Sequence, residues 1–270
     1  MGSKRSAADA LDRAQELIYD AWEATSAGRR TALARQALKI SPLCADAYVV
    51  LAEQTPPGSD AEFDLLRKAI EAGEAALGPA VFRDDAGIFW GLLETRPYMR
   101  ARLLLSRALW LRGERTESVA HLRDMLRLNP NDNQGVRYIL AAHLLEADLN
   151  DEVRDLLQAY PDEASAAWLW TAALIAFRRE GDTPRSRTML RKALQENAHV
   201  PAFLLGLRAM PKSLPPYMSP GEEDEAIHYV EEFGTGWQRS PGVLDWLRGD
   251  ASASARPRSA PAKRSRPRRQ

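Results

Sequence analysis

The sequence lacks several features that would indicate secretion, membrane insertion or disulfide chemistry. It contains one cysteine, Cys44, so no internal disulfide can form and a reducing compartment such as the cytoplasm is expected. The longest stretch without a charged residue, residues 164–177, has 14 residues, whereas a membrane-spanning helix needs about 20. Runs of β-branched residues are scarce. The composition therefore favours a mostly helical cytoplasmic protein.

Signatures of catalysis and of metal binding are also absent. The four histidines lie in separate segments, and no two of them have the i, i+4 spacing of a helical zinc site. The sequence has no glycine-rich phosphate loop, nucleophile elbow or kinase signature. Nothing identifies a base that would activate Cys44. We therefore expect no catalytic residue, no cofactor and no metal, and a protein that is not an enzyme.

A repeat with a period of 34 residues runs through the chain. Gly113 and Gly181 lie 68 residues apart, which is two periods, and Leu122, Leu156 and Leu190 share one register. Each repeat reads as an apolar helix, a tight turn and a second apolar helix. One helix pair cannot bury both apolar faces by itself, so the pattern predicts that successive pairs stack.

Prolines mark where helices end. In residues 127–135, Pro130 stops one helix, and Asn131 or Asp132 can cap the next one, which we expect to restart at Asp132. Pro42 gives an earlier repeat the same ending. The two prolines are 88 residues apart, which is two periods plus 20. The sequence therefore predicts an insertion within residues 56–98.

The segment "RARLLLSRALWLRGERTESVAHLRDMLRLNP" closely resembles a tetratricopeptide repeat. The blocks "FRDDAGIFWGLLETRPYMR", "NPNDNQGVRY" and residues 199–247 resemble the suppressor-of-tumorigenicity-seven family of tetratricopeptide proteins, in a bacterial branch. That resemblance covers roughly residues 80–248 and implies a helical scaffold without established catalysis. It also implies a membrane association, known for animal members, that this chain's lack of a transmembrane segment does not support.

The expected fold is all-α, a right-handed α-solenoid of about five tetratricopeptide-like helix pairs. We expect a disordered N-terminus over residues 1–8 and the solenoid over residues 9–248, with a capping segment at 201–248. A disordered basic tail is expected over residues 249–270, because this segment is rich in proline and poor in apolar residues.

The expected function is non-catalytic binding of a protein or an extended peptide on the concave face of the solenoid, where a peptide of acidic character would suit the groove. The first helix of each pair lines that face in such proteins. Tetratricopeptide register places four arginines there, and arginine pairs well with carboxylates. An alternative is that several of these arginines pair with acids of neighbouring repeats. The predicted partner-binding residues are Arg100, Arg107, Trp110, Gln134, Arg137, Trp168 and Arg178.

The insertion is a further candidate site. Phe89 and Trp90 are followed by Glu94 and Arg96, a mixture typical of binding hot spots. Alternatively, Trp90 fills a gap between helix pairs while Glu94 and Arg96 form internal hydrogen bonds. A hydrolase or transferase site within residues 80–100 is a third and more distant hypothesis.

The last 20 residues carry seven basic side chains and no acid. Residues 1–250 hold the remaining 30 basic residues and all 37 acids, so an acidic body precedes a basic tail. The tail could contact nucleic acid phosphates weakly and without sequence specificity, or it could only aid solubility or self-association. The residues expected to contact anions are Arg256, Arg258, Lys263, Arg264, Arg266, Arg268 and Arg269.

Overall fold

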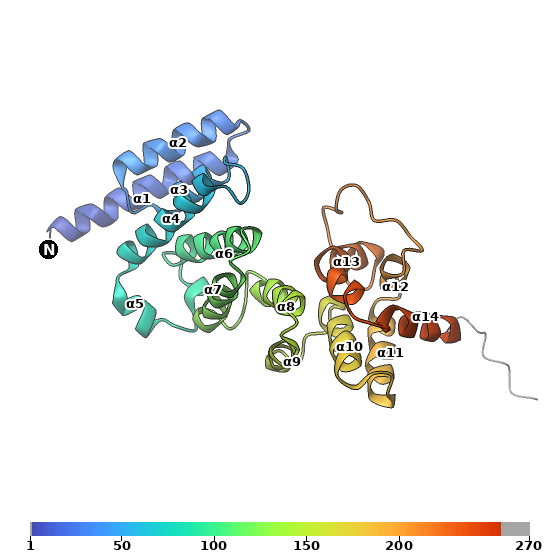
Figure 1. Ribbon diagram of the computed structural model, residues 1–270. Coiled ribbons are helices and arrows are strands. Elements are labelled where there is room, and N and C mark those ends of the chain that lie inside the picture. The colour runs from blue at the N-terminus through green and yellow to red at the C-terminus, as the bar shows by residue number, and fades with distance from the viewer. Residues whose placement is uncertain (1, 255–270) are drawn as a thin grey trace, which may run out of the picture. The chain divides into compact units, whose positions relative to one another are not determined.

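The computed structural model describes residues 2–254, with the side chains of residues 6–249. All regular secondary structure in these residues is helical, which confirms the predicted all-α class (Figure 1). The chain divides into two compact units, here called unit 1 (Met1–Leu144) and unit 2 (Leu145–Gln270). The division falls within helix α8 (Val136–Glu146).

Unit 1 is built from helix pairs that stack in chain order. The two helices of each pair pack against each other; α3 also packs on α1 and α2, and α6 packs on α3 and α4. The pairs are α1 (Gly2–Glu23) with α2 (Ala27–Ile40), α3 (Ala45–Ala52) with α4 (Asp60–Leu77), and α6 (Arg96–Leu111) with α7 (Arg115–Leu128).

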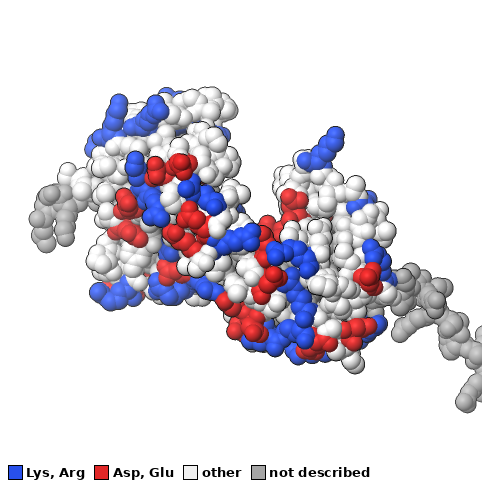
Figure 2. Space-filling view, viewed as in Figure 1, with Lys and Arg blue, Asp and Glu red and all other residues white. Residues whose placement is uncertain are grey.

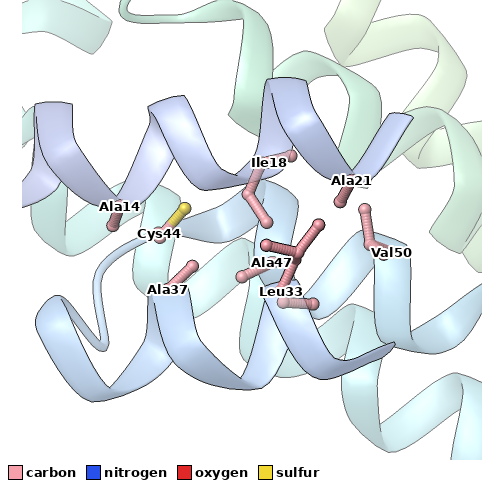
Figure 3. Packing of buried hydrophobic residues seen from close by; sticks show 9 residues of the cluster. Ala14, Ile18, Ala21, Leu33, Ala37, Cys44, Ala47 and Val50 are labelled. Atoms are coloured by element: carbon pink, nitrogen blue, oxygen red, sulfur yellow. The ribbon is translucent and has the colours of Figure 1, made fainter. Parts of the chain in front are cut away.

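Small side chains let the first helices of unit 1 approach closely. The buried cluster between α1, α2 and α3 contains several alanines around Ile18 and Leu33 (Figure 3). Cys44 belongs to this cluster and is 1% exposed. Burial raises the pKa of its thiol to about 11, so the group is neutral at pH 7. A buried neutral thiol is a packing residue and not a nucleophile.

The turn between α7 and α8 is longer than the sequence predicts. α7 ends at Leu128, but α8 begins at Val136 and not at Asp132. Asp132 instead adopts a left-handed conformation, with φ of 49°. Its carboxylate accepts hydrogen bonds from the amides of Val136, at 2.7 Å, and Arg137, at 2.9 Å. Asp132 therefore satisfies free amides of α8 from outside the helix, and the restart was placed four residues too early.

The predicted insertion forms a short helix, α5 (Pro79–Asp84), and a 3₁₀ turn, η1 (Phe89–Gly91), between α4 and α6. The Gly87 amide donates to the carbonyl of Leu128 at 2.9 Å, which fastens the insertion to the end of α7. Phe89 is fully buried, and its ring lies 5.3 Å from that of Phe82. Trp90, which one of the two interpretations of this segment placed in the gap, is only half-buried. Phe89 is thus the residue that fills the core here.

Arg96 and Thr95 hold the insertion together from within. The Arg96 guanidinium donates to the carbonyl of Trp90 at 3.0 Å and lies 5.4 Å from its ring. The Thr95 hydroxyl donates to the carbonyls of Phe89 and Leu92. Internal bonding of Arg96 agrees with the structural interpretation of this segment.

Unit 2 is centred on aromatic packing between two of its helices. Trp170 of α10 and Trp237 of α13 are both fully buried, with ring centroids 5.8 Å apart. The Trp237 indole nitrogen donates to the hydroxyl of Tyr229 at 2.7 Å. The helices of this unit are α9 (Asn150–Ala159), α10 (Ala166–Glu180), α11 (Pro184–Glu196), α12 (Val200–Leu204), α13 (Glu223–Gln238) and α14 (Val243–Ser254).

The ends of the described chain are helical. α1 begins at Gly2, and α14 extends to Ser254. Residues 2–8 and 249–254 are therefore helical where the sequence predicts disordered segments. Residues 255–270, with all seven predicted anion-contacting residues of the tail, lie outside the described residues.

Candidate functional site

Arg100, the first predicted partner-binding residue, is bound inside unit 1. Its guanidinium forms an ion pair with Asp46 of α3, with Nε 2.9 Å from Oδ1. Asp46 is fully buried, and it also accepts from the amide of Gln15 on α1 at 2.9 Å. Arg100 lies 5.0 Å from the ring of Trp22 as well. The residue therefore joins α1, α3 and α6.

Arg137 is also engaged within unit 1. Its guanidinium lies 3.3 Å from the carboxylate of Asp132 and 2.9 Å from the hydroxyl of Tyr138. These contacts fix the start of α8. Gln134, on the turn before it, is half-buried, and its side-chain oxygen has no hydrogen-bond partner among the described residues.

Trp110 contributes to the packing of unit 1 through its ring. It stacks on His143 with centroids 3.6 Å apart and planes inclined by 2°. The guanidinium of Arg115 lies 4.9 Å from the Trp110 ring. Burial lowers the pKa of His143 to about 4, so its imidazole is neutral at pH 7.

Arg178 and Trp168 belong to unit 2. The Arg178 guanidinium bonds to the Ser240 hydroxyl at 2.7 Å, to the Gly236 carbonyl at 2.8 Å and to Asn150 at 2.9 Å. Burial lowers the pKa of Arg178. Trp168 is 4% exposed. Both side chains are therefore part of the interior of unit 2.

Arg107 differs from the other three predicted arginines. It is exposed on α6, and no described residue forms an ion pair with it. On the visible face of each unit, basic and acidic residues are interspersed, and Figure 2 shows their blue and red atoms side by side. The internal contacts of Arg100, Arg137 and Arg178 favour the alternative in which these arginines are structural. Partner binding by the seven residues remains a prediction, with Arg107 the most accessible of the arginines.

A serine and a histidine lie close together in unit 1. The hydroxyl of Ser118 is 3.4 Å from Nδ1 of His143, which resembles a nucleophile and its base. However, Ser118 is fully buried and donates to the carbonyl of Ser106 at 2.7 Å. A substrate cannot reach this hydroxyl, so the pair is a packing contact.

An open cleft of about 440 Å³ lies in unit 1 between α1, α3, α4 and the start of α6. Its lining combines aliphatic and aromatic side chains with carboxylates, and none of the described residues that form it is a lysine or an arginine. It is lined by Leu11, Asp12, Gln15, Glu16, Tyr19, Leu43, Ala45, Gly73, Ala76, Leu77, Leu93, Glu94, Pro97 and Tyr98.

Two large apolar side chains of the cleft are exposed, Tyr19 at 54% and Leu93 at 70%. The lining is close-packed between α4 and α6: a Cβ added to Gly73 would lie 3.1 Å from the Tyr98 ring. Gly73 thus lets α4 approach α6. Burial raises the pKa of Tyr98, so its hydroxyl is neutral at pH 7.

Asp12, Glu16 and Glu94 bring three exposed carboxylates to the cleft. Among the described side chains, none forms an ion pair with any of the three. Sequence reasoning missed this site because it looked for ligand contacts at the arginines. The available signal was on α1, where Asp12, Glu16 and Tyr19 follow the i, i+4, i+7 spacing of one helix face.

Neither a metal-binding cluster nor a membrane-spanning helix is found among the described residues. They contain no group of three or more histidine, cysteine, aspartate or glutamate side chains that could hold a metal ion. None of the helices they form is long and apolar enough to cross a bilayer.

Comparisons with known proteins place the chain in a family. The family model of the ST7 protein matches residues 5–251. Over 283 residues the chain is 28% identical to "Protein ST7 homolog" of Caenorhabditis elegans, covering 86% of this chain and 49% of that protein. It is 29% identical over 273 residues to "Suppressor of tumorigenicity 7 protein-like" of Rattus norvegicus, covering 88% and 46%.

The corresponding human protein, "Suppressor of tumorigenicity 7 protein-like" of Homo sapiens, is 28% identical over 273 residues, covering 88% of this chain and 45% of that protein. The chain thus spans about half the length of the curated relatives it matches. No solved structure matches it. Because the family model covers most of the sequence, the chain belongs to the suppressor of tumorigenicity 7 protein family.

Proposed function

We propose that the chain is a non-catalytic scaffold of tetratricopeptide-like helix pairs that binds a protein or an extended peptide. The observation that carries this proposal is the open cleft of about 440 Å³ in unit 1. Small-molecule and side-chain binding sites are typically concave and mostly apolar, with a few polar groups that fix orientation. The cleft meets that description.

The packing of unit 1 supports a binding role. The first helices of successive pairs, α1, α3 and α6, contact one another in order. In helical repeat proteins such helices line the face that holds the ligand. The cleft lies among these helices and α4.

As part of the same proposal, the single cysteine and the excess of arginine over lysine, 31 against 6, favour a bacterial cytoplasmic protein.

Selection from a peptide-display library tests the proposal. The full chain should enrich peptides that bind it, and replacing Tyr19 and Leu93 by serine should weaken their binding at least tenfold. A chain with Ile88→Ser and Leu111→Ser is the matched control, since these side chains are exposed at 54% and 63% outside the cleft. Peptide binding at the cleft would be contradicted if no peptide is enriched from the library, or if both variants lose the same amount of peptide affinity.

The charge asymmetry of the sequence favours one alternative function. Seven basic residues and no acid in residues 251–270 would suit weak contact with nucleic acid. If all seven contact phosphates, the logarithm of the binding constant should fall with the logarithm of salt with a slope of at most about −6. Replacing the seven by glutamine should abolish DNA binding, and DNA binding that survives this change would reject the alternative.

A further inference from the structure

We propose that the cleft of unit 1 binds an extended, arginine-bearing segment of a partner protein. This inference rests on the proposed function and adds the chemistry of the partner. It also differs from the acidic peptide predicted from the arginines of the sequence, because the cleft carries the opposite charge.

No described side chain neutralises the carboxylates of the cleft. Asp12 and Glu16 belong to α1, and Glu94 comes shortly before α6. The described residues that line the cleft include no lysine or arginine, and no described side chain pairs with these carboxylates. By contrast, the buried carboxylates of Asp46 and Asp132 both hold an internal arginine. The cleft therefore presents carboxylates that a ligand can pair.

Guanidinium groups suit these carboxylates for two reasons. Arginine forms paired, charge-assisted hydrogen bonds with carboxylates in a planar fork geometry. Its charge also interacts favourably with an aromatic face, which the exposed Tyr19 ring offers at the edge of the cleft. An acidic segment, a nucleic acid or an anionic lipid headgroup would be repelled by the same three carboxylates.

The apolar lining suits the rest of the segment. The hydrocarbon stems of arginine side chains pack on apolar surface while their charged ends reach polar groups. Leu11, Leu77 and Leu93 provide such surface beside the carboxylates. A cleft of about 440 Å³ falls within the range of roughly 300–1,000 Å³ that is usual for bound ligands. This volume holds a few side chains of an extended segment and not a folded domain.

Three labelled peptides that differ only in one repeated residue are the probes. Each is a fluorescein-tagged repeat of alanine, X and proline, where X is arginine, lysine or glutamine. Fluorescence anisotropy with the full chain should show the arginine peptide binding at least tenfold more tightly than the glutamine peptide. The lysine peptide should bind with intermediate affinity, because an ammonium group cannot form the paired geometry.

Reversal of the cleft charges locates the binding. The affinity for the arginine peptide should fall at least tenfold in a variant that combines Asp12→Lys, Glu16→Lys and Glu94→Lys. The milder set Asp12→Asn, Glu16→Gln and Glu94→Gln should weaken it less and keeps the test valid if the first variant unfolds. The matched control is Asp64→Lys, Asp162→Lys and Glu231→Lys, which changes net charge equally at exposed positions outside the cleft and should bind within twofold of the unchanged chain.

Three results would overturn the inference. The first is equal binding of the arginine and glutamine peptides, and the second is an equal loss in the cleft and control variants. The third is a large gain in affinity when the seven basic residues of 251–270 are replaced by glutamine, because the chain itself would then supply the occupant. Display-selected peptides that still depend on Tyr19 and Leu93 would leave the proposed function standing in each case.

Discussion

Unit 1 and unit 2 each have buried contacts of their own between helices, and one contact in each unit shows the contrast. In unit 1 the fully buried carboxylate of Asp46 bonds to Arg100 and to Gln15, so a charged group joins three helices. In unit 2 the buried charges of Arg178 and Glu225 also join α10 to α13. The same two helices are joined by the aromatic rings of Trp170 and Trp237, and the link between Trp237 and Tyr229 is a hydrogen bond between neutral groups. The difference shows that a common helix-pair pattern leaves open the chemistry that joins one pair to the next.

This contrast has consequences for stability. A buried ion that loses its partner is costly, because the remaining charge is neither hydrated nor paired. An aromatic cluster depends on shape and on burial of apolar area. The Asp46 contact of unit 1 should therefore respond strongly to changes of charge, and the Trp170–Trp237 contact of unit 2 to changes of volume.

Replacing Asp46 by alanine should give the largest effect, a loss of about 3–5 kcal/mol in the free energy of unfolding of unit 1. The change strands Arg100, whose side chain is only 28% exposed, without its partner. Urea denaturation followed by circular dichroism measures it. Asp64→Ala, on the exposed face of α4, should cost less than about 0.5 kcal/mol.

A double replacement sharpens the same test. Asp46→Leu with Arg100→Met removes both charges and should recover most of the stability that Asp46→Ala loses. If the double variant is as unstable as the single one, packing and not charge is decisive at this position. An effect of Asp46→Ala no larger than that of Asp64→Ala would contradict the structural role of the ion pair.

Acidification should weaken unit 1 between pH 6.5 and about 4. Burial lowers the pKa of His121 to about 4, helped by the positive charge of Arg102, and burial lowers that of His143 to about 4. In the unfolded chain a histidine has a pKa near 6.5. In this window the unfolded state binds more protons, so stability is present above pH 6.5 and is lost as pH falls.

The expected loss at pH 5 is about 2 kcal/mol for each histidine, since one pKa unit corresponds to about 1.4 kcal/mol. Asp124 and Glu117 also face His121, and Asp124 has a lowered pKa, so its own contribution is lost only below about pH 4. Denaturation curves at pH 7.5, 6 and 5 measure the effect. His143→Gln should reduce the change in the free energy of unfolding between pH 7.5 and pH 5. If that change stays the same in the variant, protonation of His143 does not cause it.

Replacing Trp237 by phenylalanine should cost about 1.5 kcal/mol, mainly in unit 2. The change leaves the buried hydroxyl of Tyr229 without its donor and removes part of a fully buried ring. Burial raises the pKa of Tyr229, so neither group titrates near neutral pH. The loss should therefore be the same at pH 7.5 and pH 5. A loss that grows on acidification would erase the distinction between the units.

Local chemistry made much of the fold predictable from the sequence. The all-α class follows from the 34-residue period, and the spacing of Pro42 and Pro130 predicts an insertion in the stretch that holds α5 and η1. Capping also followed simple rules: Ser26 and Ser59 cap α2 and α4 as serine commonly does. These features are spacings and residue types read along the chain, so a single sequence contains the information.

Contacts between distant residues were not predictable in the same way. Asp46 and Arg100 are separated by 54 positions, and neither the period nor the composition pairs them. Phe89 and Trp90 are adjacent, so only the path of the insertion decides which one is buried. The cleft escaped prediction for the same reason, because its walls come from α1, α3, α4 and α6.

Arg107→Glu should have the smallest effect on folding, below about 0.5 kcal/mol, because the side chain is exposed and no described residue pairs with it. Arg178→Glu, by contrast, would place a carboxylate beside Asp148 and the Gly236 carbonyl inside unit 2 and should destabilise unit 2 strongly.

If α6 carries the acidic-peptide site predicted from the sequence, Arg107→Glu should weaken the binding of a glutamate-bearing peptide about tenfold, as measured by fluorescence anisotropy. Arg35→Glu, at an exposed position of α2, is the matched control because it changes net charge equally. Equal binding by the two variants would remove Arg107 from the predicted site and leave the acidic cleft as the binding surface of unit 1.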